Sequence, residues 1–243
     1  MAILTQMILR FLTPRFLCLL FFPVFGMSQE KPAEPAKTKP AVKRIGETRF
    51  RLGQVEFDSK TKELFIPATV NMREGGPIEY VLVHENGKVH ESILTTSASP
   101  LDIQIALNLL SYKAGIGDVF DKLLSEEALD QAGKKEDRGD GLHIFFQWKE
   151  GDEEKSSPID TLVIDGEDTE PMPVGPWIFT GSTTEGGTYM AEAEGSILAV
   201  YLDHLAIFNM ARPGSEIDER WGANGDLIPE TGIKGTVVLK KMH

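Results

Sequence analysis

The sequence predicts an α+β domain: a mostly antiparallel β-sheet with one buried helix and a second amphipathic helix packed on one face. Many short segments alternate apolar and polar residues at period two, which is typical of strands in an antiparallel sheet. Two longer stretches, residues 99–112 and 118–135, have the apolar spacing of helices. Acidic or glycine- and proline-rich loops separate these segments, which indicates a single layered domain.

The first 28 residues are typical of an export signal. Arg10 and Arg15 flank a short apolar stretch, and Gly26 and Ser28 place small residues where a signal peptidase cleaves. The apolar stretch is too short to cross a bilayer, which needs about 20 residues. We therefore expect cleavage after Ser28 and a periplasmic or secreted protein. The alternative is that residues 1–28 stay as an anchor, which is the only membrane contact that the sequence predicts.

Composition limits the partners of the mature chain. Residues 29–46 predict a disordered linker rich in proline, lysine and alanine, and residues 47–243 predict one folded domain. The single cysteine, Cys18, lies in the export signal, so the mature chain has no disulfide and no cysteine nucleophile. The formal net charge of the full chain is −12, which argues against nucleic acid or anionic lipid as a partner.

The first strands are expected in two hairpins. Residues 50–72 predict two strands around a polar turn at Asp58, because apolar residues recur at period two on either side. Residues 78–83 and 88–94 flank Asn86-Gly87. Both central positions of a type I′ turn need a positive φ, and this dipeptide meets that need well. The prediction is therefore a tight antiparallel hairpin.

Two helices are expected after these strands. In residues 99–112, Ser99 is a good N-cap and Pro100 suits the first helical position. Apolar residues cover most of this helix, so we expect it to be deeply buried. Residues 118–135 predict the second, amphipathic helix, which ends at Gly133. The remaining strand candidates are residues 142–148, 160–164, 177–182, 188–193, 196–202 and 236–241.

Two histidine–glutamate pairs, His84-Glu85 and His90-Glu91, raise the question of a metal site. In the predicted hairpin, side chains alternate between faces, so the two imidazoles point to opposite sides of the sheet. One metal ion then cannot bind both. A bulge at Gly87 is the alternative that would place them on one face, although a catalytic zinc would need a third ligand. The sequence therefore predicts no metal and no cofactor.

A loop rich in hydroxyl groups follows His90 and Glu91 and leads into the first helix. Unpaired N–H groups at a helix N-terminus attract anions, which makes this loop a candidate ligand site. The simpler alternative is that these hydroxyls cap the helix and satisfy the loop. Gly181 and Ser182 form a second candidate, but residues 180–184 lack the G-x-S-x-G pattern of a nucleophile elbow.

The stretch "IEYVLVHENGKVHESILTTSASPLDIQIALNLL" resembles the first half of the YdjY-type domain. "WIFTGS", "YMAEAEGSILAVYLDHLAIFN" and "LIPETGIKGTVVL" are similar to its second half. The resemblance spans most of residues 50–240 and treats residues 117–140 as an insertion. It implies an exported bacterial domain without an established activity, so it supports domain extent and location and adds no reaction. The positions within the family's patterns are His90, Glu91, Gly181 and Ser182.

We predict an exported, envelope-associated binding or interaction domain rather than an enzyme. Its partner would be a small ligand, a peptide or an envelope protein. The candidate binding residues are His90, Glu91, Thr95, Thr96, Ser97, Gly181 and Ser182.

Two alternatives remain for the histidine–glutamate motif. One is a hydrolase with His90 as base and Ser182 or a metal-bound water as nucleophile. The other is a purely structural role, in which His90 and Glu91 are buried and fully hydrogen-bonded.

Overall fold

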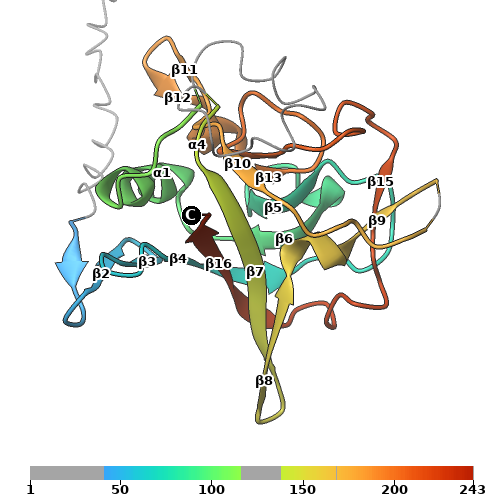
Figure 1. Cartoon of the computed structure of the whole chain (residues 1–243), viewed down its shortest axis with the longest axis horizontal. Coiled ribbons are helices and arrows are strands. Elements are labelled where there is room, and N and C mark those ends of the chain that lie inside the picture. Colours follow the sequence, from blue (N-terminus) through green and yellow to red (C-terminus); the bar gives the residue numbers. More distant parts are fainter. Residues whose placement is uncertain (1–40, 116–137, 168, 243) are drawn as a thin grey trace, which may run out of the picture. The chain divides into compact units, whose positions relative to one another are not determined.

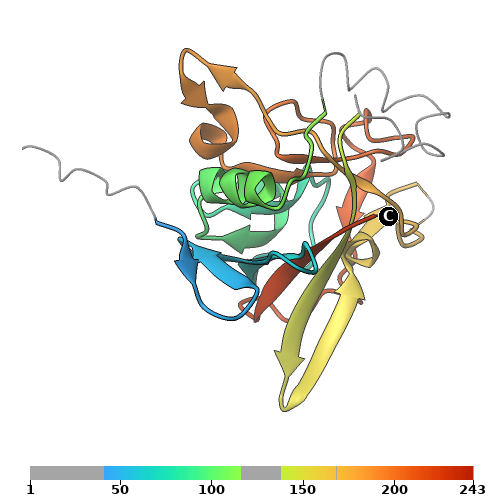
Figure 2. The same cartoon turned by 60° about the vertical axis from the view of Figure 1, so that its left-hand side comes forward.

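Eight strands pair in a ring. Their order around it is β4 (Leu64–Val70), β16 (Lys234–Lys241), β7 (Gly141–Glu150), β10 (Trp177–Phe179), β14 (Phe208–Met210), β13 (Ser196–Ala199), β5 (Tyr80–His84) and β6 (Ser92–Thr96). The last strand, β6, pairs again with β4, which closes the sheet into a barrel (Figures 1 and 2). The computed structural model describes residues 41–115, 138–167 and 169–242.

Shorter elements extend the barrel or cover its ends. The strands outside the ring are β1 (Lys43–Arg44), β2 (Arg49–Leu52), β3 (Val55–Asp58), β8 (Glu153–Pro158), β9 (Val163–Asp165), β11 (Thr184–Glu185), β12 (Thr188–Tyr189) and β15 (Trp221–Ala223). β1 to β3 continue the sheet beside β4, and β8 forms a long hairpin with β7. β11 pairs with β12, and β15 pairs with β9.

The predicted α+β class is wrong, because the domain is a mostly-β barrel with few helices. The described residues contain two α-helices, α1 (Pro100–Leu109) and α4 (Met190–Glu194), and two 3-10 turns, η1 (Val89–Glu91) and η2 (Ile159–Leu162). The predicted helix 118–135 lies outside the described residues. Period-two alternation identifies strands, but it does not say that the last strand of a sheet returns to the first.

The predicted hairpin at Asn86-Gly87 is also wrong, since β5 and β6 run parallel. The chain leaves β5, passes through η1 and enters β6 in the same direction. β13 and β14 form a second parallel pair. Both faces of β5 are covered, and strands with two buried faces need no alternation.

Gly87 does not form a type I′ turn; it allows two loops to approach each other closely. A Cβ at Gly87 would lie 2.8 Å from the carbonyl oxygen of Glu194 and 3.2 Å from the Cα of Gly195. The missing side chain therefore lets the loop after β5 touch the turn before β13.

The predicted start of the first helix is confirmed, but its deep burial is not. Ser99 Oγ accepts a hydrogen bond from the Asp102 amide at 3.3 Å, and Pro100 is the first helical residue. One face of α1 is buried, with Ile103, Ala106, Leu107 and Leu110 in the core. The other face exposes Leu101, Ile105 and Leu109.

Several other sequence predictions can be compared with the structure. The turn at Asp58 is confirmed, as Lys62 N donates to Asp58 O at 2.9 Å. The expected strand 188–193 is instead the two-residue β12 followed by α4. Segment 160–164 is divided between η2 and β9.

The barrel interior is filled by aliphatic and aromatic side chains, among them Ile66, Leu82, Ile144, Phe146, Phe208, Val237 and Leu239.

No helix in the described part of the chain is both long and apolar enough to cross a membrane.

The close packing of β16 on β7 leads to a stability prediction. A Cβ at Gly235 would lie 2.6 Å from the Phe146 ring and closer still to the Gln147 carbonyl oxygen. Gly235→Ala should therefore lower the free energy of unfolding by about 1–3 kcal/mol, as overpacking does in other cores. Urea unfolding followed by circular dichroism measures this change.

Gly222→Ala is the matched control, because Gly222 also lies in a strand and its added Cβ would meet Ile164 at an ordinary 3.5 Å. A loss of stability in Gly222→Ala as large as that in Gly235→Ala would contradict the packing argument.

Candidate functional site: an arginine pocket beside the barrel

The hydroxyl-rich loop before α1 does not present a free anion site. Glu192 of α4 accepts hydrogen bonds from the Leu101 amide at 3.0 Å and from Ser99 Oγ at 2.8 Å. The positive end of the helix is thus paired with the protein's own carboxylate. Thr96 Oγ1 donates to the Pro67 carbonyl at 2.6 Å, and the Ser97 hydroxyl donates to Gln54 at 2.9 Å. Of the three predicted hydroxyls, only that of Thr95 makes no hydrogen bond to another described residue.

His90 and Glu91 lie in η1, between the two parallel strands β5 and β6. The His90 side chain is 74% exposed, and its Nε2 lies 3.2 Å from Glu91 Oε1. This pair is not the buried, fully hydrogen-bonded unit that a purely structural role requires. Glu91 is partly buried, with Lys88 Nζ 4.0 Å from its Oε2.

Gly181 and Ser182 follow β10, and Ser182 has a structural task. Its Oγ donates to the Leu205 carbonyl at 2.5 Å and accepts from the Ala191 amide at 3.1 Å. Gly181 has a φ of +85°, and an added Cβ would lie 2.6 Å from the Ala114 side chain. Within the described ranges, no hydrogen bond or ion pair joins Ser182 to His90. The structure therefore shows no contact between the predicted base and the predicted nucleophile. Among the described residues, no three histidine, cysteine, aspartate or glutamate side chains form a group that could hold a metal ion.

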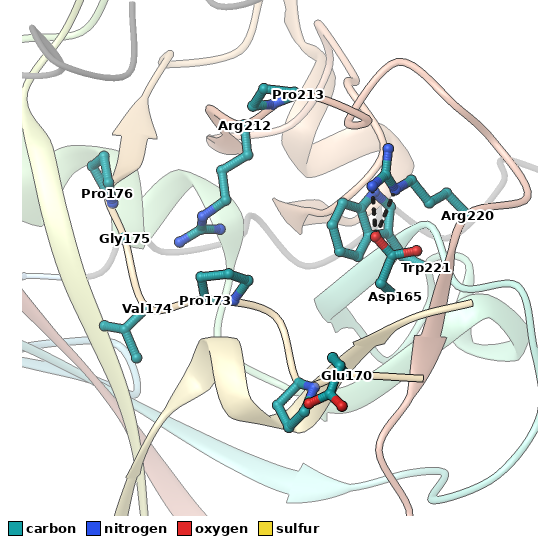
Figure 3. A pocket seen from close by; sticks show the side chains of 11 residues that line it. Asp165, Glu170, Pro173, Val174, Gly175, Pro176, Arg212, Pro213, Arg220 and Trp221 are labelled. Atoms are coloured by element: carbon teal, nitrogen blue, oxygen red, sulfur yellow. Dashed lines mark hydrogen bonds and ion pairs between the residues drawn. The ribbon is translucent and has the colours of Figure 1, made fainter. Parts of the chain in front are cut away.

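A pocket with buried charge lies elsewhere, beside β10 and β14 (Figure 3). Its volume is about 420 Å³. Its walls come from the segment before β10, the segment after β14 and the β9–β15 pair. The lining residues are Asp165, Glu170, Pro171, Pro173, Val174, Gly175, Pro176, Arg212, Pro213, Arg220 and Trp221.

Strand pairing places the two sides of this pocket. Trp177 of β10 pairs with Met210 of β14, so Gly175 and Arg212, each two residues beyond, come together. A Cβ at Gly175 would lie 2.8 Å from Arg212 Nη2. Glycine is required here because a side chain would displace the guanidinium. Figure 3 shows this guanidinium directed into the space between Pro173 and Gly175.

Arg212 is the most buried cation of the pocket. Its side chain is 10% exposed, and that of its ion-pair partner Asp160 is 1% exposed. One nitrogen, Nη2, bonds Asp160 Oδ1, and Nη1 lies 3.3 Å from the Met172 sulfur, a weak acceptor. Burial raises the pKa of Asp160, although the charge of Arg212 opposes this shift. An arginine carries five N–H donors, so this guanidinium keeps donors for a further acceptor.

The second arginine of the pocket, Arg220, is hydrogen-bonded to Asp165. Its Nε and Nη2 donate to Asp165 Oδ2 at 2.9 and 2.6 Å, and this contact lowers the pKa of Asp165. Trp221 pairs with Asp165 across the β9–β15 ladder, and its Nε1 donates to the Gly214 carbonyl at 3.0 Å. Arg220 is therefore fixed by two hydrogen bonds to its carboxylate partner, whereas the more buried Arg212 bonds its carboxylate partner through one nitrogen.

Reasoning from the sequence did not identify this pocket. Its charged residues are spread from Asp160 to Arg220, and only strand pairing unites them. A local signal exists in the proline-spaced segment "PMPVGP" (171–176) and in "RPG" (212–214), which places an arginine beside proline and glycine.

Fold and site together define a closed β-barrel domain with an arginine-lined pocket at its side. The chain belongs to the YdjY domain family, whose model matches residues 55–240. This confirms the resemblance seen in the sequence. No curated protein and no solved structure matches the chain.

The contrast between Ser182 and His90 can be tested by unfolding. Ser182→Ala removes both hydrogen bonds of a partly buried hydroxyl, so we expect it to lower the free energy of unfolding by about 1–2 kcal/mol. His90→Ala changes an exposed side chain and should stay within about 0.5 kcal/mol of the wild type. Chemical denaturation of both variants checks this, and a larger loss for His90→Ala would show that its environment differs from the one described.

Proposed function

We propose that this protein is an exported, envelope-associated binding domain, and that its pocket holds the carboxylate of a small ligand through Arg212. The observation that carries the proposal is a guanidinium that is nine-tenths buried, lines a cavity and has one carboxylate partner bonded through a single nitrogen. A planar guanidinium is suited to a carboxylate because its donors match the two oxygens.

The rest of the pocket lining supports a ligand with an apolar body. Four prolines and Val174 line the cavity, so the part of the ligand beyond its carboxylate would meet mostly carbon, with Asp165, Glu170 and Arg220 as the other charged groups of the lining. Most small-molecule sites combine apolar walls with a few convergent polar groups in this way.

The lining also favours binding over catalysis. It contains no serine, histidine, lysine or cysteine, and of its two carboxylates Asp165 is held by two hydrogen bonds from Arg220. The export part of the proposal is supported by the apolar N-terminal stretch with its flanking arginines and by the absence of cysteine after Cys18.

The ligand class can be tested with matched pairs of probes. Phenylacetate and N-acetyl-L-proline are each compared with their amides, which keep the shape and lose the charge, and inorganic phosphate tests a different anion. We expect the carboxylates to bind and the amides to bind at least tenfold more weakly, because a hydrogen bond to a charged group contributes about 1.5–3 kcal/mol. Isothermal titration calorimetry measures each affinity.

Arg212→Lys is the informative variant, because it keeps the charge beside Asp160 and removes the planar donor fork. It should weaken carboxylate binding about tenfold or more. Arg73→Lys, which alters a partly buried arginine that pairs with Glu230 and does not line the pocket, is the control and should bind like the wild type. Equal binding of acid and amide, unchanged affinity in Arg212→Lys, or no binding of any probe at millimolar concentration would each contradict the proposal. Tighter binding of phosphate than of the carboxylates would mean that the pocket binds phosphate instead of a carboxylate.

A further inference from the structure

The ion pair of Asp160 and Arg212 lies at the back of the arginine pocket. Asp160 belongs to η2 and its side chain is 1% exposed, whereas the Arg212 side chain is 10% exposed and lines the cavity. Asp160 is not among the lining residues, so the guanidinium lies between this carboxylate and the cavity. A ligand carboxylate would therefore reach the cation from the cavity side, with Asp160 behind it.

Asp160 also holds the wall of the pocket. Its Oδ1 accepts a hydrogen bond from Arg212 Nη2 and another from the Gly175 amide, the latter at 3.2 Å. Both bonds use the same oxygen. A proton on Oδ2 would therefore remove the negative charge and leave both bonds in place.

The charge balance of this pair changes when a ligand carboxylate enters. In the free pocket, the charges of Asp160 and Arg212 cancel. With a carboxylate bound, two anions share one buried cation, and little solvent is present to screen the excess negative charge. Two carboxylates that share a site do not both stay ionised at low cost, so the pKa of one of them rises.

The surroundings select Asp160 as the group that takes the proton. Burial raises the pKa of Asp160 even in the free protein, while the charge of Arg212 and the hydrogen bond from Gly175 oppose this shift. Asp165 differs, because its hydrogen bonds from Arg220 lower the pKa of its carboxyl group.

The other ionisable groups around η2 do not take this place. η2 packs against β7, β8 and β9. β9 carries Asp165, and no charged side chain of β7 or β8 is among the groups that shift the pKa of Asp160. Glu170 lines the cavity but is exposed, so solvent stabilises its charge. Among the described residues, no histidine lines the cavity.

We propose that the pocket takes up a proton together with its ligand carboxylate, and that Asp160 receives this proton. The proton comes from solvent: the ligand enters as its anion, Arg212 keeps its positive charge, and the carboxylate of Asp160 becomes a neutral carboxyl group. This inference rests on the proposed function, because it needs a carboxylate bound at Arg212. It makes Asp160 a positioning residue whose charge controls the affinity of the site.

The coupling predicts a pH dependence of definite sign. The pKa of Asp160 is higher in the complex than in the free protein, so the affinity rises as the pH falls through the pKa of the complex and levels off below that of the free protein. N-acetyl-L-proline is a suitable ligand, because its carboxyl group, with a pKa of about 3.5, stays ionised down to about pH 4.5. Its affinity should be at least tenfold higher at about pH 5.5 than at about pH 8, since each pH unit between the two pKa values changes the affinity about tenfold.

Isothermal titration calorimetry measures the proton directly. Titrations are made at the pH where the affinity changes most steeply, in buffers of different ionisation enthalpy, none of them a carboxylate or a phosphate. The slope of the binding heat against the buffer enthalpy gives the protons taken up per ligand. We expect between about half a proton and one proton. This measurement uses the wild-type protein, so it decides the question even where a variant fails to fold.

Asp160→Asn is the informative variant, because it keeps an oxygen acceptor for both donors and takes up no proton. It should bind N-acetyl-L-proline about tenfold more tightly than the wild type at about pH 8, with no proton uptake and little change of affinity with pH. A residue that only held Arg212 in place would weaken binding when replaced, so the direction of the change separates the two roles.

Asp102→Asn is the matched control. Asp102 is also a buried carboxylate whose pKa is raised by burial, and it lies in α1 and does not line the pocket. This variant should keep the affinity and the proton uptake of the wild type. Thermal melts of both variants check that they fold.

The outcomes separate this inference from the proposed function. No binding of any carboxylate between about pH 5.5 and pH 8 contradicts both. Carboxylate binding without proton uptake, or with equal affinity at the two pH values, overturns the inference alone. Weaker binding in Asp160→Asn also overturns it, as does proton uptake that persists in this variant, which would assign the proton to another carboxylate such as Glu170.

Discussion

The pairing of β6 with β4 is the contact on which the rest of this domain depends. Thr69 and Val70 of β4 pair with Thr95 and Leu94 of β6, and this turns an open sheet into a closed barrel. Asn71 extends the seam, as its amide donates to the Ile93 carbonyl at 2.8 Å and its side-chain nitrogen to the carbonyls of Val89 and Ser92. Closure removes the free edges of the central sheet and encloses its apolar core.

Two parallel strand–loop–strand units complete the ring. β5 and β6 form one, β13 and β14 form the other, and β5 pairs antiparallel with β13 between them. Their loops meet outside the barrel over Tyr80, whose hydroxyl lies 2.7 Å from Asp203 Oδ2. The Glu79 carbonyl accepts hydrogen bonds from the amides of Val200 and Tyr201. Burial between these loops raises the pKa of Tyr80 well above its usual range.

The arginine pocket depends on the register of the barrel strands. It is built from segments that enter β10 and leave β14, so the pairing of Trp177 with Met210 determines how Arg212 meets Gly175. The barrel thereby places a buried cation beside its wall.

The sequence by itself determined the features that depend on neighbouring residues: the Ser99 cap and Pro100 start of α1, the turn at Asp58, and the short patterns that indicate the YdjY domain. Tertiary structure decided the barrel class, the parallel direction of β6 after Asn86-Gly87, and the meeting of Asp160 with Arg212. The physical reason is distance along the chain. Caps and turns satisfy their own backbone groups locally, whereas closure and buried charge pairs arise between residues that only the folded sheet brings together.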